Sequence, residues 1–296
     1  MSLERFEPKY IGGIYPDMDD DTYFSLPMLS QSQAKLLIPP STPAHFDYAL
    51  RHGQAPKAAF DLGHAAHLYT LGKGSQLALI EAGDYRTKAA QEARNAAYAA
   101  RRVPLLADQY EQVLAMAEAL SSVPEIAEIL TSPDAHTEVS LIALRDDVWI
   151  RGKIDLLLGD MMFDYKTSDR PATIEGFTRS AADHGYYFQA TWYLTIAALL
   201  NMPIRHFRFI AQEKVPPYYA AVFELDDEWQ QLGYQQMTAA IDLYRRCQTS
   251  GKWPGYPTTV QKILMPRWLK PSWSPNEGLY DELKQLIGDI ENNAIL

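Results

Sequence analysis

The sequence predicts a mixed α/β protein whose helical first part leads into a β-sheet core. In the first part, apolar side chains recur at helical spacing, for example Ala65, Leu68 and Leu71, and Gly72 is placed to end that helix. At Thr137 the pattern changes to an alternation of period two, which is typical of strands. We therefore expect three consecutive strands, a helix, two further strands and a long helix: 137–144, 148–158, 161–167, 186–200, 205–212, 218–225 and 226–247.

The chain is expected to consist of an arm, a single domain and a tail. Residues 1–27 are rich in Pro, Gly and Asp and predict an extended N-terminal arm. Residues 251–296 contain several prolines and tryptophans and predict a tail that wraps the body. The single domain between them is 28–250, with a mostly helical segment, the sheet core and a helix at 28–135, 136–225 and 226–250.

Composition excludes several classes of protein. The net charge of −10 argues against a uniformly basic surface that coats nucleic acid, although a local groove can still attract phosphate. The single cysteine, Cys247, excludes internal disulfides and multi-cysteine metal sites. No stretch approaches the ~20 apolar residues that a membrane span needs. We expect a cytoplasmic protein without a membrane partner.

Pairing the predicted strands places three carboxylates in one row. A two-residue hairpin turn at Gly159-Asp160 puts Asp155 opposite Asp164. A second two-residue turn, at Asp146-Asp147, puts Glu138 opposite Asp155 as well. Because side chains alternate between the two faces of a strand, all three carboxylates share one face of the predicted sheet.

The row indicates a divalent cation. Opposed residues on a sheet have Cβ atoms only ~4.5–5.5 Å apart, so like charges there are destabilising unless a cation lies among them. Mg²⁺ prefers such oxygen ligands, and Lys166, two residues beyond Asp164, lies on the same face beside it. The alternative is a solvated face with alternating charges, which would explain Asp155 alone. Asp164 lies within an otherwise apolar strand and favours the metal site.

Two further pairs share helix faces. His64 and His67 are three residues apart, and we interpret His64 as a packing residue; zinc is disfavoured because no third soft ligand is present. Gln189 and Tyr193 are four residues apart on the helix after the third strand, and both can donate to phosphate oxygens. The alternative for this helix is an amphipathic face that only packs the sheet.

Seven short motifs follow one another in order along roughly 28–225: Leu29-Ser30-Gln31-Ser32, Pro43-Ala44-His45-Phe46, Leu62-Gly63-His64-Ala65-Ala66-His67, Glu138-Val139-Ser140, Gly152-Lys153-Ile154-Asp155-Leu156, Asp164-Tyr165-Lys166-Thr167 and Gln189-x-x-x-Tyr193. The last four resemble the ordered motifs of the RecB-like branch of the PD-(D/E)XK nuclease superfamily. The first three are similar to the C-terminal nuclease domain of RecE (exonuclease VIII) and its phage relatives.

The resemblance implies a restriction-endonuclease-like core, with a central mixed sheet flanked by helices. It implies one or two Mg²⁺ or Mn²⁺ ions and a catalytic Lys166, with Gln189 and Tyr193 on the DNA side. The metal ligands that it implies are His67, Asp155, Asp164, the Tyr165 carbonyl and Glu138, the last directly or through water. As partners it implies DNA, a single-strand annealing protein and a homo-oligomeric ring.

We therefore expect a deoxyribonuclease, specifically a 5′-to-3′ exonuclease on duplex DNA that generates single strands for recombination. Two alternatives stay open: a structure-specific or single-strand nuclease in repair or defence, and a non-catalytic DNA-binding scaffold with the same fold. The cations expected to bind the DNA strand are Arg151, Lys153, Arg101, Arg102 and Lys88.

Overall fold

The computed structural model describes residues 11–53, 61–72, 76–269, 281 and 284–285, and every structural statement below concerns these residues. Residues 1–255 form one compact unit, and residues 256–296 form a second. In the second unit the described residues include a short 3₁₀ helix, η2 (Arg267–Leu269). The helix expected from the spacing of Ala65, Leu68 and Leu71 covers 57–71, and its first part lies outside the described residues.

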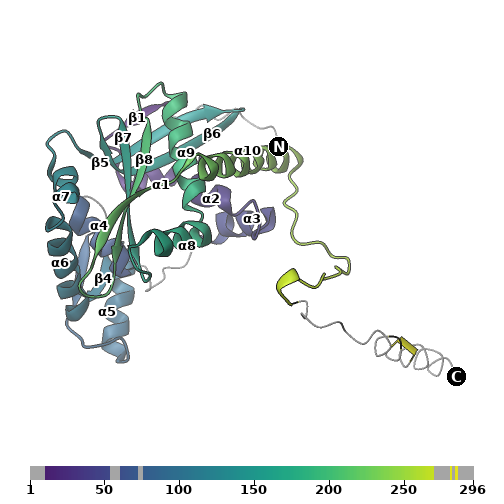
Figure 1. The fold of residues 1–296 in the computed structure, drawn as a ribbon. Coiled ribbons are helices and arrows are strands. Elements are labelled where there is room, and N and C mark those ends of the chain that lie inside the picture. Colours follow the sequence, from purple (N-terminus) through teal and green to yellow (C-terminus); the bar gives the residue numbers. More distant parts are fainter. Residues whose placement is uncertain (1–10, 54–60, 73–75, 270–280, 282–283, 286–296) are drawn as a thin grey trace. The chain divides into compact units, whose positions relative to one another are not determined.

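A mixed seven-stranded sheet forms the centre of the first unit (Figure 1). Its strand order is β1-β5-β6-β7-β8-β9, and β2 joins it by pairing with β6. The β7–β8 and β2–β6 pairs are parallel, and the other pairs are antiparallel. The strands are β1 (Gly13–Tyr15), β2 (Leu29–Ser30), β5 (His136–Arg145), β6 (Val148–Leu158), β7 (Met161–Ser168), β8 (His206–Glu213) and β9 (Ala220–Glu224).

Helices cover both faces of this sheet, as predicted for a mixed α/β core. Helices α6 and α7 lie on the left of the sheet in Figure 1, and α9 and α10 lie on its right. The helices are α1 (Asp20–Ser25), α2 (Gln31–Lys35), α3 (Pro43–His52), α4 (Asp61–Leu71), α5 (Lys88–Ala99), α6 (Ala107–Ser121), α7 (Pro124–Thr131), α8 (Ile174–His184), α9 (Tyr186–Leu199) and α10 (Asp227–Ser250).

Short strands account for most of the differences from the prediction. The segment expected as an extended arm contains β1, which pairs with β5, and also the helix α1. A separate two-stranded parallel sheet joins β3 (Leu77–Ile80) to β4 (Val103–Leu106) within the part expected to be mostly helical. Strands of two to four residues are too short to show a clear alternation of apolar and polar positions.

The hairpin registers expected from the turns are confirmed at both turns. Leu158 pairs with Met161, and Arg145 pairs with Val148. However, the β6–β7 ladder ends at Leu156↔Phe163, one step before Asp155 would pair with Asp164. The prediction that Asp155 and Asp164 are paired across the hairpin is therefore wrong in detail, because the strands separate at this point.

The sheet splits along one edge of β6. On that edge β2 pairs with β6 at Ile150 and Arg151, and β7 pairs with it only from Leu156 onward. Between Arg151 and Leu156, no described strand pairs with this edge of β6, and side chains bond there instead. The Tyr193 hydroxyl donates to the Lys153 carbonyl (2.9 Å), and the Tyr165 N–H donates to Asp155 Oδ2 (2.8 Å). These bonds satisfy backbone groups that a continuous ladder would otherwise have paired.

Gly152 lets the Tyr193 ring lie against β6. A Cβ atom at position 152 would come within 2.4 Å of the Tyr193 ring. Tyr193 is itself nearly buried, and its neighbour Trp192 is fully buried and donates from its indole nitrogen to the Arg151 carbonyl (2.9 Å). The glycine of the Gly152-Lys153-Ile154-Asp155 motif is therefore required by packing at the split.

Substituting Gly152 by Ala should destabilise the fold. The added methyl group overlaps the Tyr193 ring, which is fixed by its hydrogen bond to the Lys153 carbonyl and by stacking on Phe207. Overpacking of this kind costs about 1–3 kcal/mol of unfolding free energy. Urea unfolding measures the change. Gly83→Ala is the matched control, because a Cβ atom there meets nothing within 4 Å. Equal unfolding midpoints for the two variants would contradict this account of the split.

Small residues bring α4 close to β7. A Cβ atom at Gly63 would lie only 3.1 Å from Thr167 Oγ1, and Ala65 and Ala66 are both almost fully buried. Because these positions carry no bulky side chain, the helix approaches the sheet closely enough for His67, on its next turn, to reach the split.

No helix among the described residues is long and apolar enough to cross a bilayer.

Candidate metal centre

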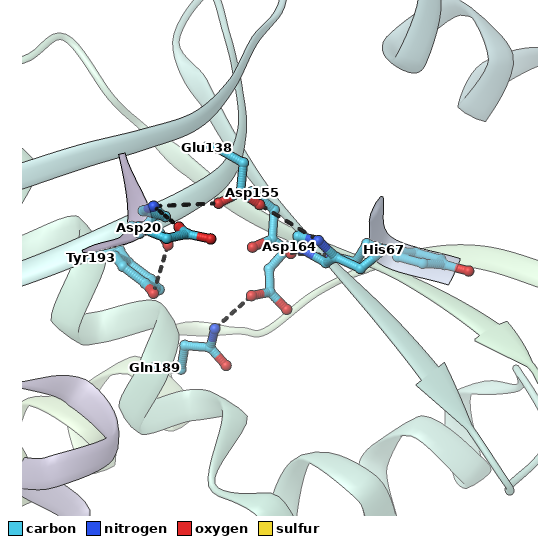
Figure 2. Close-up of polar contacts among 9 residues, drawn as sticks. Asp20, His67, Glu138, Asp155, Asp164, Gln189 and Tyr193 are labelled. Carbon is cyan, nitrogen blue, oxygen red and sulfur yellow. Dashed lines mark hydrogen bonds and ion pairs between the residues drawn. The ribbon is translucent and has the colours of Figure 1, made fainter. Parts of the chain in front are cut away.

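Three potential metal ligands converge at the split. His67 Nε2 lies 3.0 Å from Asp155 Oδ2, and His67 Nδ1 lies 3.5 Å from Glu138 Oε1. One ligand atom from each of the three residues lies within 4.8 Å of the others. Figure 2 shows His67 reaching the carboxylates from the side opposite Tyr193. A helix (α4) and two adjacent strands (β5 and β6) therefore supply one site.

Glu138 has an unusual backbone. Its register position lies between the pairs Thr137↔Leu156 and Val139↔Ile154, which places it beside Asp155 as expected. Its φ of 56° is in the left-handed region, which residues other than glycine rarely adopt. Strain of this kind is concentrated at functional sites, and here it occurs at the residue that faces His67.

The donor set fits a hard divalent cation. One imidazole nitrogen and two carboxylate oxygens match the ligands of Mg²⁺ and Mn²⁺ better than those of a soft metal. Protonated His67 places a compensating positive charge beside these carboxylates. Burial opposes that charge, but Asp155, Glu138 and Asp164 outweigh it and raise the pKa of His67 to about 9. A positive charge is therefore favoured where a cation would bind.

The two carboxylates of this group differ in their protonation. Burial and the neighbouring Asp155 charge raise the pKa of Glu138 to about 7. Burial also disfavours the charged form of Asp155, but His67 and Lys166 outweigh it and hold the pKa of Asp155 below its usual value. Asp155 is therefore the fixed negative charge of the site, and Glu138 titrates near neutral pH.

Asp164 and Lys166 form a second pair beside this group. Lys166 Nζ contacts Asp164 Oδ2, and the Gln189 amide donates to Asp164 Oδ1 (2.5 Å; Figure 2). Burial and the charge of Asp155 raise the pKa of Asp164 to about 6. Burial opposes the charged form of Lys166, but Asp164 and Asp155 outweigh it and raise its pKa. Lys166 is therefore a half-buried, charged donor beside the three ligands.

An open cleft gives access to these groups. Its volume is about 740 Å³, and its lining includes His67, Asp155, Asp164 and Lys166. Tyr165, whose carbonyl is among the predicted metal ligands, lies between Asp164 and Lys166 and lines the same cleft. That carbonyl and Asp164 stay predictions as metal ligands, because the three converging residues are His67, Glu138 and Asp155.

Gln189 and Tyr193 have protein partners in place of the phosphate oxygens expected for them. Gln189 bonds Asp164, and Tyr193 bonds the Lys153 carbonyl. Both side chains come from α9 and are mostly buried. In this state they orient the carboxylate and the strand edge, and a role toward DNA stays a prediction for both.

The predicted DNA-binding cations are dispersed. Lys153 contacts Asp20 and lies 3.9 Å from Glu138 Oε2, and Arg101 contacts Asp21. Arg102 is exposed and donates to the Leu77 carbonyl (2.8 Å). Arg151 is only 3% exposed and lines a cavity other than the cleft at the metal centre. Lys88 is exposed near Glu92 on α5.

Two residues near the site were missed from the sequence. Asp20 contacts Lys153 beside Glu138 from the segment expected to be an extended arm. Lys35 donates to the His184 carbonyl (2.7 Å), and burial and the charge of Lys166 lower its pKa to about 8. The acidic run at 19–21 was the available signal for Asp20, since acidic residues favour the first turn of a helix. Lys35 gave none.

Metal affinity should rise with pH. Metal binds the deprotonated forms, so protons must leave His67 and Glu138, whose pKa values are about 9 and about 7. Below pH 7 both groups hold protons that a cation must displace, and above pH 9 neither does. We expect Mn²⁺ affinity to rise by up to about tenfold per pH unit for each proton released. Calorimetric titration at pH 6, 7, 8 and 9 measures it, and an affinity independent of pH would contradict the ligand set.

The fold and the site together define the PD-(D/E)XK class. The fold is a mixed sheet with flanking helices, and the site combines acidic residues on adjacent strands with the Asp-x-Lys sequence Asp164-Tyr165-Lys166. Residues 30–263 match the family described as PDDEXK-like domain of unknown function (DUF3799), and the chain belongs to that family.

Solved structures match the chain, and the first of the following two shares its fold. One is a protein from Eubacterium rectale named "putative exonuclease", with a TM-score of 0.59 and 12% identity over 84% of this chain and 96% of that chain. A phage-related exonuclease from Haemophilus somnus 129PT matches with a TM-score of 0.33 and 11% identity over 77% of this chain and 97% of that chain. No curated protein matches the chain. The predicted fold class, a restriction-endonuclease-like mixed α/β core, is confirmed.

Proposed function

We propose that the protein is a metal-dependent deoxyribonuclease that hydrolyses DNA phosphodiester bonds. The observation that carries the proposal is the convergence of His67, Glu138 and Asp155 within one ligand sphere, with the Asp164–Lys166 pair beside it in an open cleft. Membership of the PDDEXK-like family supports the same conclusion. A solvated sheet face does not account for this arrangement, because the carboxyl groups are largely buried.

The chain's own residues divide the chemistry between them. His67, Glu138 and Asp155 would hold the cation, with Asp164 as a further predicted ligand. A divalent cation supplies Lewis-acid chemistry: it neutralises charge on the phosphate and acidifies water. Lys166 carries a positive charge at neutral pH and would donate to the attacking water and to the phosphate oxygens, where negative charge develops. Gln189 holds the Asp164 carboxylate in place through its amide.

The finer function that we propose is 5′-to-3′ exonuclease action on duplex DNA that leaves single strands for recombination. It is supported by the resemblance of the ordered motifs to RecE-like nucleases. A single-strand annealing protein and a homo-oligomeric ring are proposed on the same basis. Mg²⁺ or Mn²⁺ is the proposed cofactor, because the donor set combines carboxylate oxygens with one imidazole.

The direct test is digestion of end-labelled duplexes with 5′-phosphate, 5′-hydroxyl or blocked ends, with and without Mg²⁺. We expect Mg²⁺-dependent release of nucleotides from the 5′ end. Cutting of only single-stranded or branched DNA would replace the exonuclease by the structure-specific alternative. The Asp164→Ala variant should lose at least about 100-fold in rate, and Asp160→Ala, at the hairpin turn of the same strands, should not. Intact Mg²⁺-dependent digestion by Asp164→Ala would contradict the proposal.

A further inference from the structure

Arg151 is a buried cation without a matching anion. It is 3% exposed, and its Nε and Nη1 atoms have no hydrogen-bond partner among the described residues. It forms no ion pair with a carboxylate in the part of the chain that the structure describes. Its guanidinium lies over the ring of Tyr23, at 4.7 Å from the centroid. Burying an unpaired charge is costly, so this arrangement indicates a ligand that pairs with it.

The cavity at Arg151 has the chemistry of an anion site. Its volume is about 380 Å³, and its lining includes Arg151 together with Ser30, Ser32 and Gln33. The Ser30 hydroxyl already bonds Gln33 Oε1 (3.1 Å), so the groups that can donate to a ligand oxygen are the Ser32 hydroxyl and the Gln33 amide nitrogen. No aspartate or glutamate is among the described residues that line it, in a chain whose net charge is −10. A guanidinium with neutral donors around it suits the tetrahedral oxygens of a phosphate group.

The cavity lies along the same strand as the metal centre. Arg151, Lys153 and Asp155 alternate along β6 and therefore project to one face of it. Four residues of strand span about 13 Å, and the phosphates of one DNA strand advance about 3.4 Å along the helix axis per nucleotide. A strand whose scissile phosphate lies at Asp155 would therefore bring a phosphate a few nucleotides away to Arg151.

We propose that the cavity formed by Arg151, Ser30, Ser32 and Gln33 binds a phosphate group, and that the group is a non-scissile backbone phosphate of the bound DNA strand. The site is separate from the metal ligands and acts in binding and register, without taking part in hydrolysis. That the phosphate belongs to DNA rests on the proposed nuclease function. Free inorganic phosphate has the same chemistry, and the test distinguishes the two sources.

The test is a methylphosphonate scan, in which the charge of one backbone phosphate of a labelled duplex is removed at a time. The readout is equilibrium binding of each duplex to the full chain in the presence of Ca²⁺. In the wild type, one non-scissile position should weaken binding about tenfold when its charge is removed. In Arg151→Gln that single penalty should vanish, while the penalties at other positions persist. Arg208→Gln, which removes an arginine on β8 that donates to Glu224 (2.8 Å), is the matched control and should retain the wild-type pattern.

Two further measurements keep the test decisive. Thermal melting with inorganic phosphate reports on the free anion: stabilisation of the wild type but not of Arg151→Gln, with no change in the scan, would assign the site to free phosphate and overturn the DNA assignment. Ser32→Ala is a milder variant for the case that Arg151→Gln does not fold, and it should reduce the same single penalty. A penalty pattern that neither variant alters, without any effect of phosphate, would overturn the proposal. Failure of Asp164→Ala to stop digestion would overturn the nuclease function instead.

Discussion

Replacing Asp155 by Asn should remove both metal binding and DNA cleavage. Asp155 is the half-buried carboxylate that stays ionised, because His67 and Lys166 hold its pKa below the usual value. Asn preserves the shape and can still accept the Tyr165 N–H, so the strand edge should stay intact. It lacks the negative charge that faces His67. We expect Mn²⁺ affinity to fall by at least about 100-fold and the cleavage rate by about 10²–10³-fold or more.

Calorimetric titration with Mn²⁺ and single-turnover digestion measure the two effects on the same preparation. Asp160→Asn is the matched control, since that residue lies at the hairpin turn between the same two strands. The unfolding temperature should hardly change in Asp160→Asn, and it should fall in Asp155→Asn because the ion pair with His67 is lost. Wild-type Mn²⁺ affinity in Asp155→Asn would show that the cation does not bind at the convergence of His67, Glu138 and Asp155.

The strand registers could be predicted because long strands joined by two-residue turns leave little freedom. The Arg145↔Val148 and Leu158↔Met161 pairs followed from the turns, and they placed Glu138, Asp155 and Asp164 near one another. The separation of β6 from β7 could not be predicted. It depends on two hydrogen bonds between a side chain and a backbone group, which leave no periodic pattern in the sequence.

The sequence alone also could not tell which charges are free to bind a ligand. Lys153 and Arg101 were expected to face DNA, but they contact Asp20 and Asp21 of a helix that was not predicted. Arg151 was expected in the same groove and is instead buried in a cavity of its own. Burial and ion pairing depend on contacts between distant segments, so composition and spacing do not determine them.

Small residues explain why His67 could be placed only through resemblance. Its spacing from His64 on a helix says nothing about a sheet more than sixty residues away in the chain. The contact requires Gly63, where a Cβ atom would lie only 3.1 Å from Thr167 Oγ1, and the buried Ala65 and Ala66. The role of these small residues can be understood only once the helix is known to lie against β7, because a larger side chain at any of them would move His67 away from Asp155.

Replacing Lys166 by Met should abolish cleavage while metal binding persists. Lys166 contacts Asp164 and lies over the ring of Tyr186, at 5.3 Å, without belonging to the three converging ligands. Met fills a similar volume but cannot donate to a phosphate oxygen or carry charge. We expect the single-turnover rate to fall by about 10²–10³-fold. Mn²⁺ affinity should stay equal or increase, because a positive charge next to Asp155 is removed.

The loss of Lys166 should also alter the titration of Asp164. Without its cation, the pKa of this buried carboxyl should rise above its value of about 6, because burial and the charge of Asp155 are then opposed only by the weaker effect of His67. Lys214→Met is the matched control: Lys214 lines the same cleft and pairs with Asp169 at 3.1 Å. If Lys166→Met lost Mn²⁺ binding together with activity, Lys166 would support the fold of the site. Retained binding with lost cleavage would assign it to the chemical step.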